Sequence, residues 1–555
     1  MAFNISDYLV TDDLTILLGL IGATVFLLRN LYKPQPLVHP ILLGRQSDVA
    51  RVRNSAESAV YRNYGTGLMG RFPIRPSKEV HLISDFVKPD SDAPRTLWST
   101  KTTNPRLSER VAAFGTGLVR LAGLQPQEST VLLALNDGLE FLISDLALAA
   151  HSIRSYTLSS PALLSPVLEA FPPSAIITHA EFLPHILELI YDSDEPQQHT
   201  IIVVGEPSPK TLASVASQVR LITWSDIERD GTRVDKIYTA PPKPSDVFTV
   251  SFFENKSTGL QGAELTHENF TAGTAAIRAL LPLANAISPL DTIVSGHSLS
   301  TAYGRAIAYT ALYEGTSFAT LTSTKMFVEQ SARANDVRDI LSANAQPIPP
   351  PTILFAKPGH LDALTTAIMQ QAERSRILFP IAWRHKTAAL AEGFLTKDSL
   401  WDRLLFDGAR ANIINEAAGT LRGVVISGGP EPLRAAALPR ARVALSVPIV
   451  NVLSHALVAG PVLASHALDL QTFPAPGGAV AHVGPPTVNV EAKLVGVDDA
   501  VVEAGGNPEG VLLVRGPPVG TLFGAGKEVQ VDEGWAGTGE RARVQTNGAF
   551  TILSD

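Results

Sequence analysis

The chain contains no cysteine. This absence excludes disulfide bonds, thiolate metal sites and a catalytic thiol, and it fits a reducing compartment. Long runs of lysine and arginine are also missing, and the formal net charge is -8. Because binding to a phosphate backbone requires clustered cations, we expect no nucleic-acid partner.

The chain is long and apolar enough to bury a large core. It has 555 residues, of which 45% are hydrophobic and 18% charged, so most of it is expected to be globular. It also contains 41 glycines and 40 prolines, which indicates many turns and loops.

The N-terminal segment Leu14–Leu28 is uncharged and mostly apolar. A bilayer span needs about 20 residues. Extension of the segment to Tyr32 gives nineteen, with Arg29 able to reach the interface. No small-residue cleavage site follows, which favours a retained membrane anchor over a cleaved signal peptide, with a buried core helix as the alternative.

Charged residues flank this segment asymmetrically. Acidic residues precede it and basic residues follow it, so the positive-inside rule predicts that the large C-terminal part faces the cytosol. The endoplasmic reticulum is the expected membrane, with the mitochondrial outer membrane and the peroxisome as alternatives.

Short apolar runs alternate with helical patterns through most of the chain. Val131–Leu135 predicts a buried strand, Leu139–Ala150 a helix and Ser155–Leu158 a second strand, which is a βαβ unit and favours a parallel sheet. Near the C-terminus, short strands such as Val511–Val514 alternate with glycine and proline, which predicts a small β-rich subdomain. Further strands are predicted at Ala175–Ile177, Ile201–Val204, Asp291–Val294, Thr352–Phe355 and Val424–Ile426.

The central stretch Val247–Asn269 has the parts of a phosphate cradle. It begins with the apolar strand Val247–Phe253, continues through a polar loop with Gly259 and Gly262, and enters a helix at Leu265–Asn269. Loop amides and a helix N-terminus can hold an anion without a cationic side chain.

This stretch resembles the phosphate loop of the AMP-forming acyl-CoA synthetases, the adenylate-forming ligases. The loop of that family runs Thr-Ser-Gly-Thr-Thr-Gly-x-Pro-Lys-Gly and then x-x-Leu-Thr-His-x-Asn. The resemblance covers Thr96 to Asp555 and is closest to the long-chain fatty acyl-CoA synthetases. Matching residues are Gly262, Leu265, Thr266, His267 and Asn269 in the loop, and Tyr303–Arg305, Gly428–Gly429 and His482–Leu494 elsewhere.

The resemblance implies an α/β fold, the large N-terminal domain of the adenylate-forming ligases, with parallel-sheet subdomains and a small β-rich subdomain. We therefore expect residues 1–33 to be the membrane anchor, 34–95 a tether and 96–555 the AMP-binding domain. Ser554 stands at the family's hinge, so the C-terminal lid domain, which carries a catalytic lysine in the family, is expected to be absent.

The resemblance also implies a chemistry. In the family a carboxylate attacks ATP to give acyl-adenylate and pyrophosphate, and CoA then displaces AMP. ATP and Mg²⁺ are the cofactors implied if the chain is active, and none is implied otherwise. No catalytic residue and no metal ligand is assigned. The implied cofactor-binding residues are Ser257, Thr258, Gly259, Gly262 and Thr266 for phosphate, Gly428 and Gly429 near adenine, and Glu540 for ribose.

Several motif positions depart from the family pattern. Gln261 replaces the loop lysine, with or without a one-residue deletion in the alignment, and Glu254 adds a carboxylate beside the expected polyphosphate. The family motif Tyr-Gly-x-Thr-Glu aligns with Leu453–Leu457, where Leu457 cannot ligate a hard cation and Ala456 has no hydroxyl. The ribose-binding Thr-Gly-Asp becomes Thr538–Glu540, a mild change.

These departures predict a catalytically degenerate, membrane-anchored acyl-CoA synthetase homologue. It is expected to bind an acyl chain, a nucleotide or a protein partner at the cytosolic face, with a long-chain fatty acid or acyl-CoA as the candidate lipid. One alternative is an active long-chain fatty acid–CoA ligase that works through an acyl-adenylate. The other is a structural docking protein.

Overall fold

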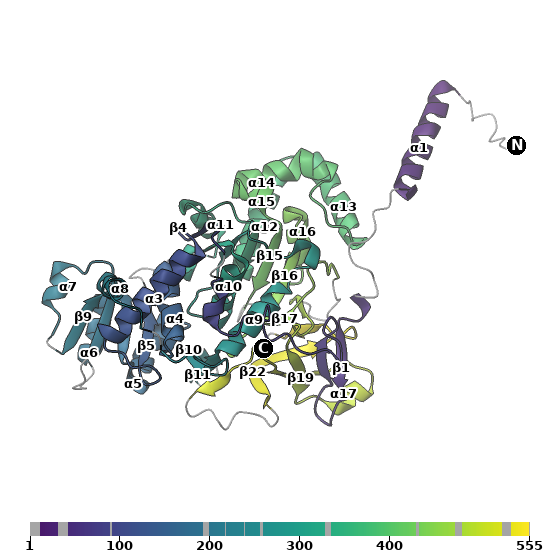
Figure 1. The fold of residues 1–555 in the computed structure, drawn as a ribbon. Helices are drawn as coiled ribbons and strands as arrows, with labels where there is room; N and C mark the ends of the chain where they lie inside the picture. The colour runs from purple at the N-terminus through teal and green to yellow at the C-terminus, as the bar shows by residue number, and fades with distance from the viewer. Residues whose placement is uncertain are drawn as a thin grey trace, which may run out of the picture.

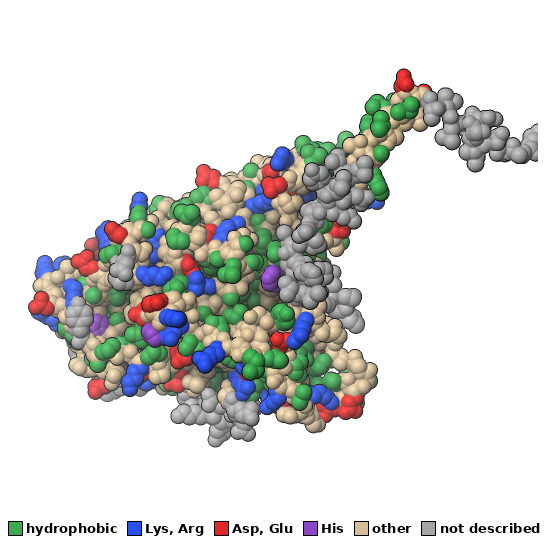
Figure 2. Space-filling model, turned by 45° about the vertical axis from the view of Figure 1, so that its right-hand side comes forward, with side chains coloured by type: hydrophobic (Ala, Val, Ile, Leu, Met, Phe, Trp, Pro, Cys, Tyr) green, Lys and Arg blue, Asp and Glu red, His purple; other side chains and the backbone are tan. Residues whose placement is uncertain are grey.

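The computed structural model describes most of the chain. The described residues are 12–31, 43–88, 91–192, 199–216, 218–237, 239–255, 259–327, 335–428, 432–471, 480–523 and 534–553. On the face shown in Figure 2, acidic and basic side chains are interspersed over the surface.

The first of three sheets has eight strands in the order β21-β11-β10-β6-β5-β7-β8-β9. The run from β10 to β9 is parallel, whereas β11 pairs antiparallel with both β10 and β21. Helices α3, α4 and α8 lie together beside this sheet in Figure 1. The elements are α3 (Asn104–Arg120), β5 (Thr130–Ala134), α4 (Leu139–Ala150), β6 (Arg154–Leu158), α5 (Leu164–Ala170), β7 (Ala175–His179), α6 (Leu183–Asp192), β8 (His199–Val204), α7 (Pro209–Ala213), β9 (Val219–Thr223), α8 (Trp224–Arg233), β10 (Val247–Asn255), β11 (Gly259–Thr266) and β21 (Thr521–Phe523).

The second sheet also has eight strands, in the order β17-β16-β15-β14-β12-β13-β3-β4. Its centre is parallel, and only the edge pairs β16–β17 and β3–β4 are antiparallel. The elements are β3 (Arg95–Leu97), β4 (Thr100–Thr102), α9 (His267–Arg278), β12 (Thr292–Ser295), α10 (Ala302–Glu314), β13 (Ser317–Thr320), α11 (Val337–Ser342), β14 (Ile353–Ala356), α12 (Pro358–Glu373), α13 (Leu378–Ala391), α14 (Asp407–Ile414), α15 (Ala417–Thr420), β15 (Gly423–Ser427), α16 (Ala437–Leu445), β16 (Ile449–Ser454) and β17 (Pro461–Ala464).

The third sheet is antiparallel and has seven strands in the order β1-β2-β19-β20-β22-β23-β18. Two of these strands, β1 and β2, come from the segment predicted to be a tether, and β2 pairs with β19. Part of that segment therefore belongs to the folded domain. The strand is hard to recognise in the sequence because a register shift between Val49 and Arg51 interrupts the alternation of inward-facing and outward-facing side chains. The elements are β1 (Ser47–Arg51), β2 (Val60–Asn63), β18 (His482–Gly484), β19 (Glu491–Val495), α17 (Asp499–Glu503), β20 (Glu509–Arg515), β22 (Ala536–Val544) and β23 (Phe550–Ile552).

The prediction of a transmembrane anchor is wrong for the described part of the chain. The N-terminal segment forms helix α1 (Asp13–Leu31), but no helix among the described residues is long and apolar enough to cross a bilayer. The helix has 19 residues, two of which are the charged Asp13 and Arg29. Its apolar length therefore falls short of the about 20 residues that a span requires.

The central stretch does not run from a loop directly into a helix, as the sequence suggested. Strands β10 and β11 form an antiparallel hairpin in which Asn255 lies opposite Gly259. Helix α9 begins only after Thr266, at the far end of β11. Eight residues at about 3.3 Å each separate the loop from the helix by roughly 25 Å. The hairpin tip and the N-terminus of α9 therefore cannot hold one anion together.

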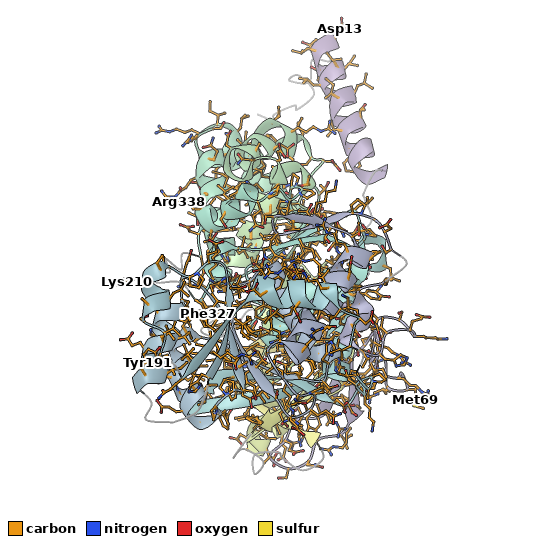
Figure 3. The ribbon with its side chains drawn as sticks, turned by 60° about the vertical axis from the view of Figure 1, so that its left-hand side comes forward. Asp13, Met69, Tyr191, Lys210, Phe327 and Arg338 are labelled. Atoms are coloured by element: carbon orange, nitrogen blue, oxygen red, sulfur yellow. The ribbon has the colours of Figure 1, made fainter. Side chains whose placement is uncertain are left out.

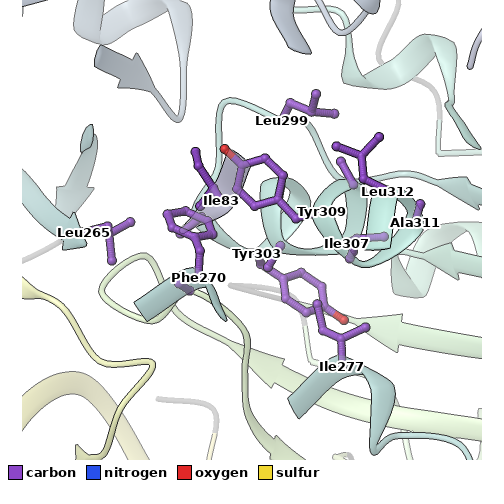
Figure 4. Packing of buried hydrophobic residues seen from close by; sticks show 14 of the residues in the cluster. Ile83, Leu265, Phe270, Ile277, Leu299, Tyr303, Ile307, Tyr309, Ala311 and Leu312 are labelled. Atoms are coloured by element: carbon purple, nitrogen blue, oxygen red, sulfur yellow. The ribbon is translucent and has the colours of Figure 1, made fainter. Parts of the chain in front are cut away.

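Helices α9 and α10 form the centre of the main hydrophobic core (Figure 4). Phe270 of α9 packs against Tyr309 of α10 with ring centroids 5.3 Å apart. Ile307 and Tyr303 of α10 are buried in the same cluster. This packing fixes the N-terminal end of α10, which forms part of the candidate site.

Candidate functional site

One cavity lies where segments from all three sheets meet. Its volume is about 370 Å³. It is bounded by the ends of β10 and β16, by the N-terminus of α10 and by β22. Ligands of α/β sheets bind outside the carboxyl ends of the strands, which is where β10 and β16 reach this cavity. The lining residues are Phe253–Asn255, His297, Thr301–Tyr303, Ser454–Ala456, Thr538–Arg541 and Leu553.

Local hydrogen bonds position the polar walls. Thr301 is the N-cap of α10, and its hydroxyl accepts a hydrogen bond from the Gly304 amide at 3.2 Å. Ser454 ends β16, and its hydroxyl lies 2.7 Å from the Ser427 hydroxyl. Thr538 donates its hydroxyl to the Leu512 carbonyl at 2.9 Å. These side chains are held by the fold, so the cavity is largely pre-formed.

Two histidines in the wall are electrically neutral. Burial lowers the pKa of His455 to about 4, and its Nδ1 accepts a hydrogen bond from the Leu457 amide at 3.2 Å. Burial, reinforced by the charge of Lys357, lowers the pKa of His297 to about 3. Both rings therefore lack a positive charge at pH 7, and neither can balance a phosphate.

Two buried polar atoms in this wall have no partner among the described residues. They are Nε2 of His297 and the hydroxyl oxygen of Tyr303, whose rings meet edge-on with centroids 5.1 Å apart. Leaving a buried polar group unpaired costs about 1–3 kcal/mol. A ligand with hydrogen-bonding groups at this part of the cavity would remove that cost.

The charges that line the cavity are few. Among the described lining residues, Glu254 and Glu540 supply two carboxylates and Arg541 supplies the one cationic side chain. The charged lining is therefore weakly acidic. It suits a neutral or weakly charged ligand better than a polyanion.

Some of the predicted site residues lie at or near the cavity, and others lie outside the described part of the chain. Glu540 lines the cavity. Gly259 faces Asn255 across the hairpin and has a φ of 76°, a conformation that favours glycine. Gly428 follows Ser427, the residue whose hydroxyl contacts the wall residue Ser454. Ser257, Thr258 and Gly429 lie outside the described residues.

Two other predicted site residues, Gly262 and Thr266, have structural roles and do not contact the cavity. A Cβ at Gly262 would lie 3.0 Å from side-chain atoms of Phe523 and of Val250, so glycine here provides room for packing within the sheet. Thr266 caps α9: its hydroxyl accepts from the Asn269 amide at 3.2 Å, and the Asn269 side chain accepts from the Thr266 amide at 2.8 Å. Neither residue lines the cavity.

Sequence reasoning missed several wall residues. Tyr303 belongs to a matching segment, but no site role was assigned to it. His297 and Thr301 carry no local motif, whereas Ser454 lies in the aligned segment Leu453–Leu457 and Arg541 follows Thr538–Glu540. All four residues come together only through contacts between distant parts of the chain. The matching segment Tyr303–Arg305 was the usable signal for Tyr303, although no role was assigned to it.

Comparison with protein-family models finds no match for this chain. Among proteins with known names, it is 25% identical over 533 residues to the peroxisomal long chain acyl-CoA synthetase 6 of Arabidopsis thaliana, covering 90% of this chain and 70% of that protein. It is 24% identical to the long-chain-fatty-acid–CoA ligase 5 of Mus musculus, covering 81% of this chain and 63% of that protein. The chain is a homologue of the AMP-forming acyl-CoA synthetases.

Solved structures agree on the fold. An anthranilate CoA ligase in complex with anthranoyl-AMP aligns over 86% of this chain and 78% of its own, with a TM-score of 0.60 and 17% identity. A long-chain-fatty-acid-CoA ligase from Archaeoglobus fulgidus aligns over 86% of this chain and 84% of its own, with a TM-score of 0.58 and 14% identity. The predicted family and its α/β adenylate-forming fold are confirmed.

Three motif positions of this acyl-CoA synthetase homologue converge in the cavity. They are the start of the phosphate loop at Glu254 and Asn255, the segment Ser454–Ala456, and Thr538–Glu540. The residues present at these positions do not fit a magnesium triphosphate. Leu457, at the metal-binding position, has no ligand oxygen and is 3% exposed within the core. No group of three or more acidic or histidine side chains in the described ranges is arranged to hold a metal ion.

Proposed function

We propose that this acyl-CoA synthetase homologue is catalytically degenerate and that its cavity binds an adenosine-like neutral ligand without transferring an adenylyl group. The observation that carries this proposal is the charge of the wall. It has two carboxylates, one guanidinium and two neutral imidazoles where the family places a magnesium triphosphate.

Electrostatics disfavour a triphosphate here. Two like unit charges 4 Å apart repel by about 1 kcal/mol in bulk water and by about 4 kcal/mol near a protein surface. Glu254 and Glu540 would each repel a polyphosphate in this way, and Arg541 offsets only one of them. Leu457 leaves no metal carboxylate to neutralise the phosphates. The adenosine part of the ligand carries no charge, so the two carboxylates do not repel it.

Hydrogen bonds favour the nucleoside part. Glu540 stands at the ribose-binding position, and a carboxylate accepts hydrogen bonds from hydroxyl groups. His297 Nε2 and the Tyr303 hydroxyl are buried without partners and offer further contacts to a polar ring. The apolar side chains of Phe253 and Leu553 complete a wall on which a base can pack.

The test is calorimetry on the full chain with adenosine, AMP and ATP. We expect adenosine to bind at least as tightly as ATP. Glu540→Gln keeps some hydrogen bonding and should weaken adenosine several-fold less than Glu540→Ala. The exposed Glu392→Gln, outside the cavity, serves as the matched control. ATP binding much tighter than adenosine binding would overturn the proposal.

The alternative function, an active long-chain fatty acid–CoA ligase, is favoured by the similarity to long-chain acyl-CoA synthetases and by Glu540 at the ribose position. It is tested by incubating the full chain with a long-chain fatty acid, ATP, Mg²⁺ and CoA. Stoichiometric release of pyrophosphate and AMP over many turnovers establishes the ligase. Our proposal predicts no release above that of a heat-denatured sample.

A further inference from the structure

A second cavity lies against α3 and α4 and shares no lining residue with the candidate functional site. Its volume is about 340 Å³, which is in the range of small-molecule sites. The two helices lie side by side and form one part of the wall (Figure 1). The rest of the wall comes from the segment around the short helix η2 (Ile83–Phe86) and from residues that precede β10.

Most side chains that line this cavity are apolar, and none of those described carries a formal charge at pH 7. The polar ones are Ser84, Ser108, His151 and Thr239. The Thr239 hydroxyl donates to the Ala150 carbonyl at 3.4 Å, so it is already paired within the protein. A carboxylate or phosphate would lose its hydration here without a cation to replace it, so these walls favour an uncharged ligand. The apolar lining residues include Leu82, Val87, Val111, Leu146, Ile237 and Pro242.

One polar group that lines this cavity is buried without a partner. His151 is the C-cap residue of α4 and is 5% exposed, and its Nδ1 has no hydrogen-bond partner among the described residues. Burial lowers the pKa of the ring below its ordinary value, so the imidazole is neutral at pH 7. A neutral imidazole has one N–H donor and one acceptor nitrogen. A hydroxyl group suits either nitrogen, because it both donates and accepts.

Helix α3 leaves room for this imidazole. Gly115 lies in the interior of α3, where glycine is less favourable than alanine. A Cβ at this position would collide with Cδ2 and Nε2 of His151, so the glycine allows the ring to lie against the helix backbone. Pro241 lines the same cavity and is exposed. The cavity therefore leads from the surface to the buried imidazole.

We propose that this cavity, the His151 site, binds an uncharged, compact apolar molecule that carries one hydroxyl group, such as an alkylphenol. The apolar body packs against α3 and α4, and the hydroxyl forms a hydrogen bond with the His151 imidazole. The uncharged walls select a neutral ligand, and the unpaired imidazole selects the hydroxyl. The His151 site is independent of the candidate functional site and of the proposed function.

The test compares 4-isopropylphenol, 4-isopropyltoluene and 4-isopropylbenzoate in calorimetry on the full chain at pH 7. The phenol and the toluene have nearly the same shape and differ by a hydroxyl in place of a methyl group, so their affinity ratio reports the contact to His151. We expect the phenol to bind about fivefold more tightly than the toluene and at least about tenfold more tightly than the benzoate.

Three results would overturn the proposal. The first is an affinity for the toluene equal to or above that for the phenol, because the imidazole would then make no contact with the hydroxyl. The second is an affinity for the benzoate equal to or above that for the phenol, because the walls would then not select against charge. The third is the absence of binding by all three compounds.

A substitution of His151 isolates the hydrogen bond. His151→Phe keeps a ring beside Gly115 and removes both nitrogens, so it should abolish the preference for the phenol while the toluene still binds. His185→Phe is the matched control and should change no affinity. His185 is 52% exposed on α6, the helix that also carries Tyr191 at the edge of the molecule in Figure 3. A preference for the phenol that persists in His151→Phe would overturn the role of the imidazole.

A second substitution fills the cavity. Ala112 lines it from α3, and leucine is a good helix former, so Ala112→Leu should abolish binding of the phenol and of the toluene. If this variant fails to fold, Ser108→Leu replaces it. Ser108 is half-buried and lies one turn earlier on the same face of α3. Wild-type binding of the phenol by a folded variant would contradict its placement in this cavity.

A third substitution distinguishes this cavity from the candidate functional site. Glu540→Ala should leave the affinity for the phenol unchanged, because Glu540 lines the candidate functional site and not the His151 site. Loss of binding in Glu540→Ala, together with wild-type binding in Ala112→Leu, would overturn the assignment and place the phenol in the candidate functional site. Failure of this test leaves the calorimetry with adenosine unaffected.

Discussion

The carboxylate of Asp145 and the guanidinium of Arg305 form an ion pair, with Oδ1 and Nη1 3.3 Å apart and neither side chain exposed to solvent. Arg305 also donates to the hydroxyls of Thr249 at 2.9 Å and Thr157 at 2.8 Å, and Tyr309 donates to Asp145. The network joins α4 and α10 to the first sheet. It therefore fixes the helix whose N-terminus lines the candidate functional site.

Removal of one partner from this pair should be strongly destabilising. Arg305→Met leaves a buried carboxylate without its cation, and we expect the free energy of unfolding to fall by about 3–5 kcal/mol. Urea denaturation measures the loss. Arg120→Ala is the control, because Arg120 is 52% exposed and its Nε lies 3.7 Å from Asp230. The control should cost less than about 1 kcal/mol. An equal, small loss in both variants would show that the buried network does not support the fold.

The neutral state of His455 predicts a pH dependence of stability. Its pKa is about 4 in the folded protein, against a normal value of 6.5, because the ring is buried. As the pH falls below 6.5, the His455 ring therefore becomes protonated in the unfolded chain but stays neutral in the folded chain. The contribution to stability is complete above pH 6.5 and is lost as the pH falls from 6.5 towards 4.

His455→Gln removes this contribution. The wild-type chain should lose about 2 kcal/mol more than the variant between pH 7 and pH 5, as measured by urea denaturation at both pH values. His185→Gln, at a ring that is 52% exposed, should match the wild type. If His455→Gln shows the wild-type pH dependence, the pKa of His455 is the same in the folded and the unfolded chain, and burial does not hold this ring neutral at acidic pH.

Thr266 distinguishes a structural role from the phosphate-binding role predicted from the sequence. Its hydroxyl caps α9, so Thr266→Ala should lower stability by about 1 kcal/mol, whereas Thr266→Ser should retain the cap. Nucleotide affinity should be the same in both variants, because Thr266 does not line the cavity. Weaker nucleotide binding by Thr266→Ala at unchanged stability would restore the phosphate-binding role.

The sequence predicted most of the parallel sheets correctly. The apolar runs at Val131–Leu135, Ile201–Val204 and Val424–Ile426 are buried strands with neighbours in register. Such runs are recognisable because a parallel strand covered on both faces needs apolar residues throughout. Helix α10 is apolar along most of its length for a related reason, because its residues face the core on nearly every side.

The errors arose where local sequence conflicted with distant contacts. Gly259–Thr266 contains two glycines and polar residues, which suggested a loop, yet it forms β11 because β10 and β21 pair with it on both sides. The segment containing β1 was predicted to be a tether, and its strand depends on pairing within a sheet formed mainly by residues more than 400 positions later.

The candidate site could be predicted only in part. Glu540 was assigned because its motif is contiguous in the sequence. His297 was not assigned, because it belongs to no aligned motif and meets the other wall residues only in the folded structure. Ser454 and Arg541 lie within or beside aligned motifs, but at positions to which the resemblance gives no role. The apolar walls, such as Leu553, could not be distinguished from ordinary core residues before the cavity was seen.

The affinity of the full chain for ATP, with and without Mg²⁺, tests the proposed function most directly. Leu457 supplies no carboxylate for a metal, and one cationic side chain, that of Arg541, is found among the described lining residues. We therefore predict that calorimetry gives the same weak ATP affinity in millimolar Mg²⁺ and in excess chelator. An affinity at least tenfold tighter in Mg²⁺ would contradict the claim that this acyl-CoA synthetase homologue has lost its phosphate chemistry.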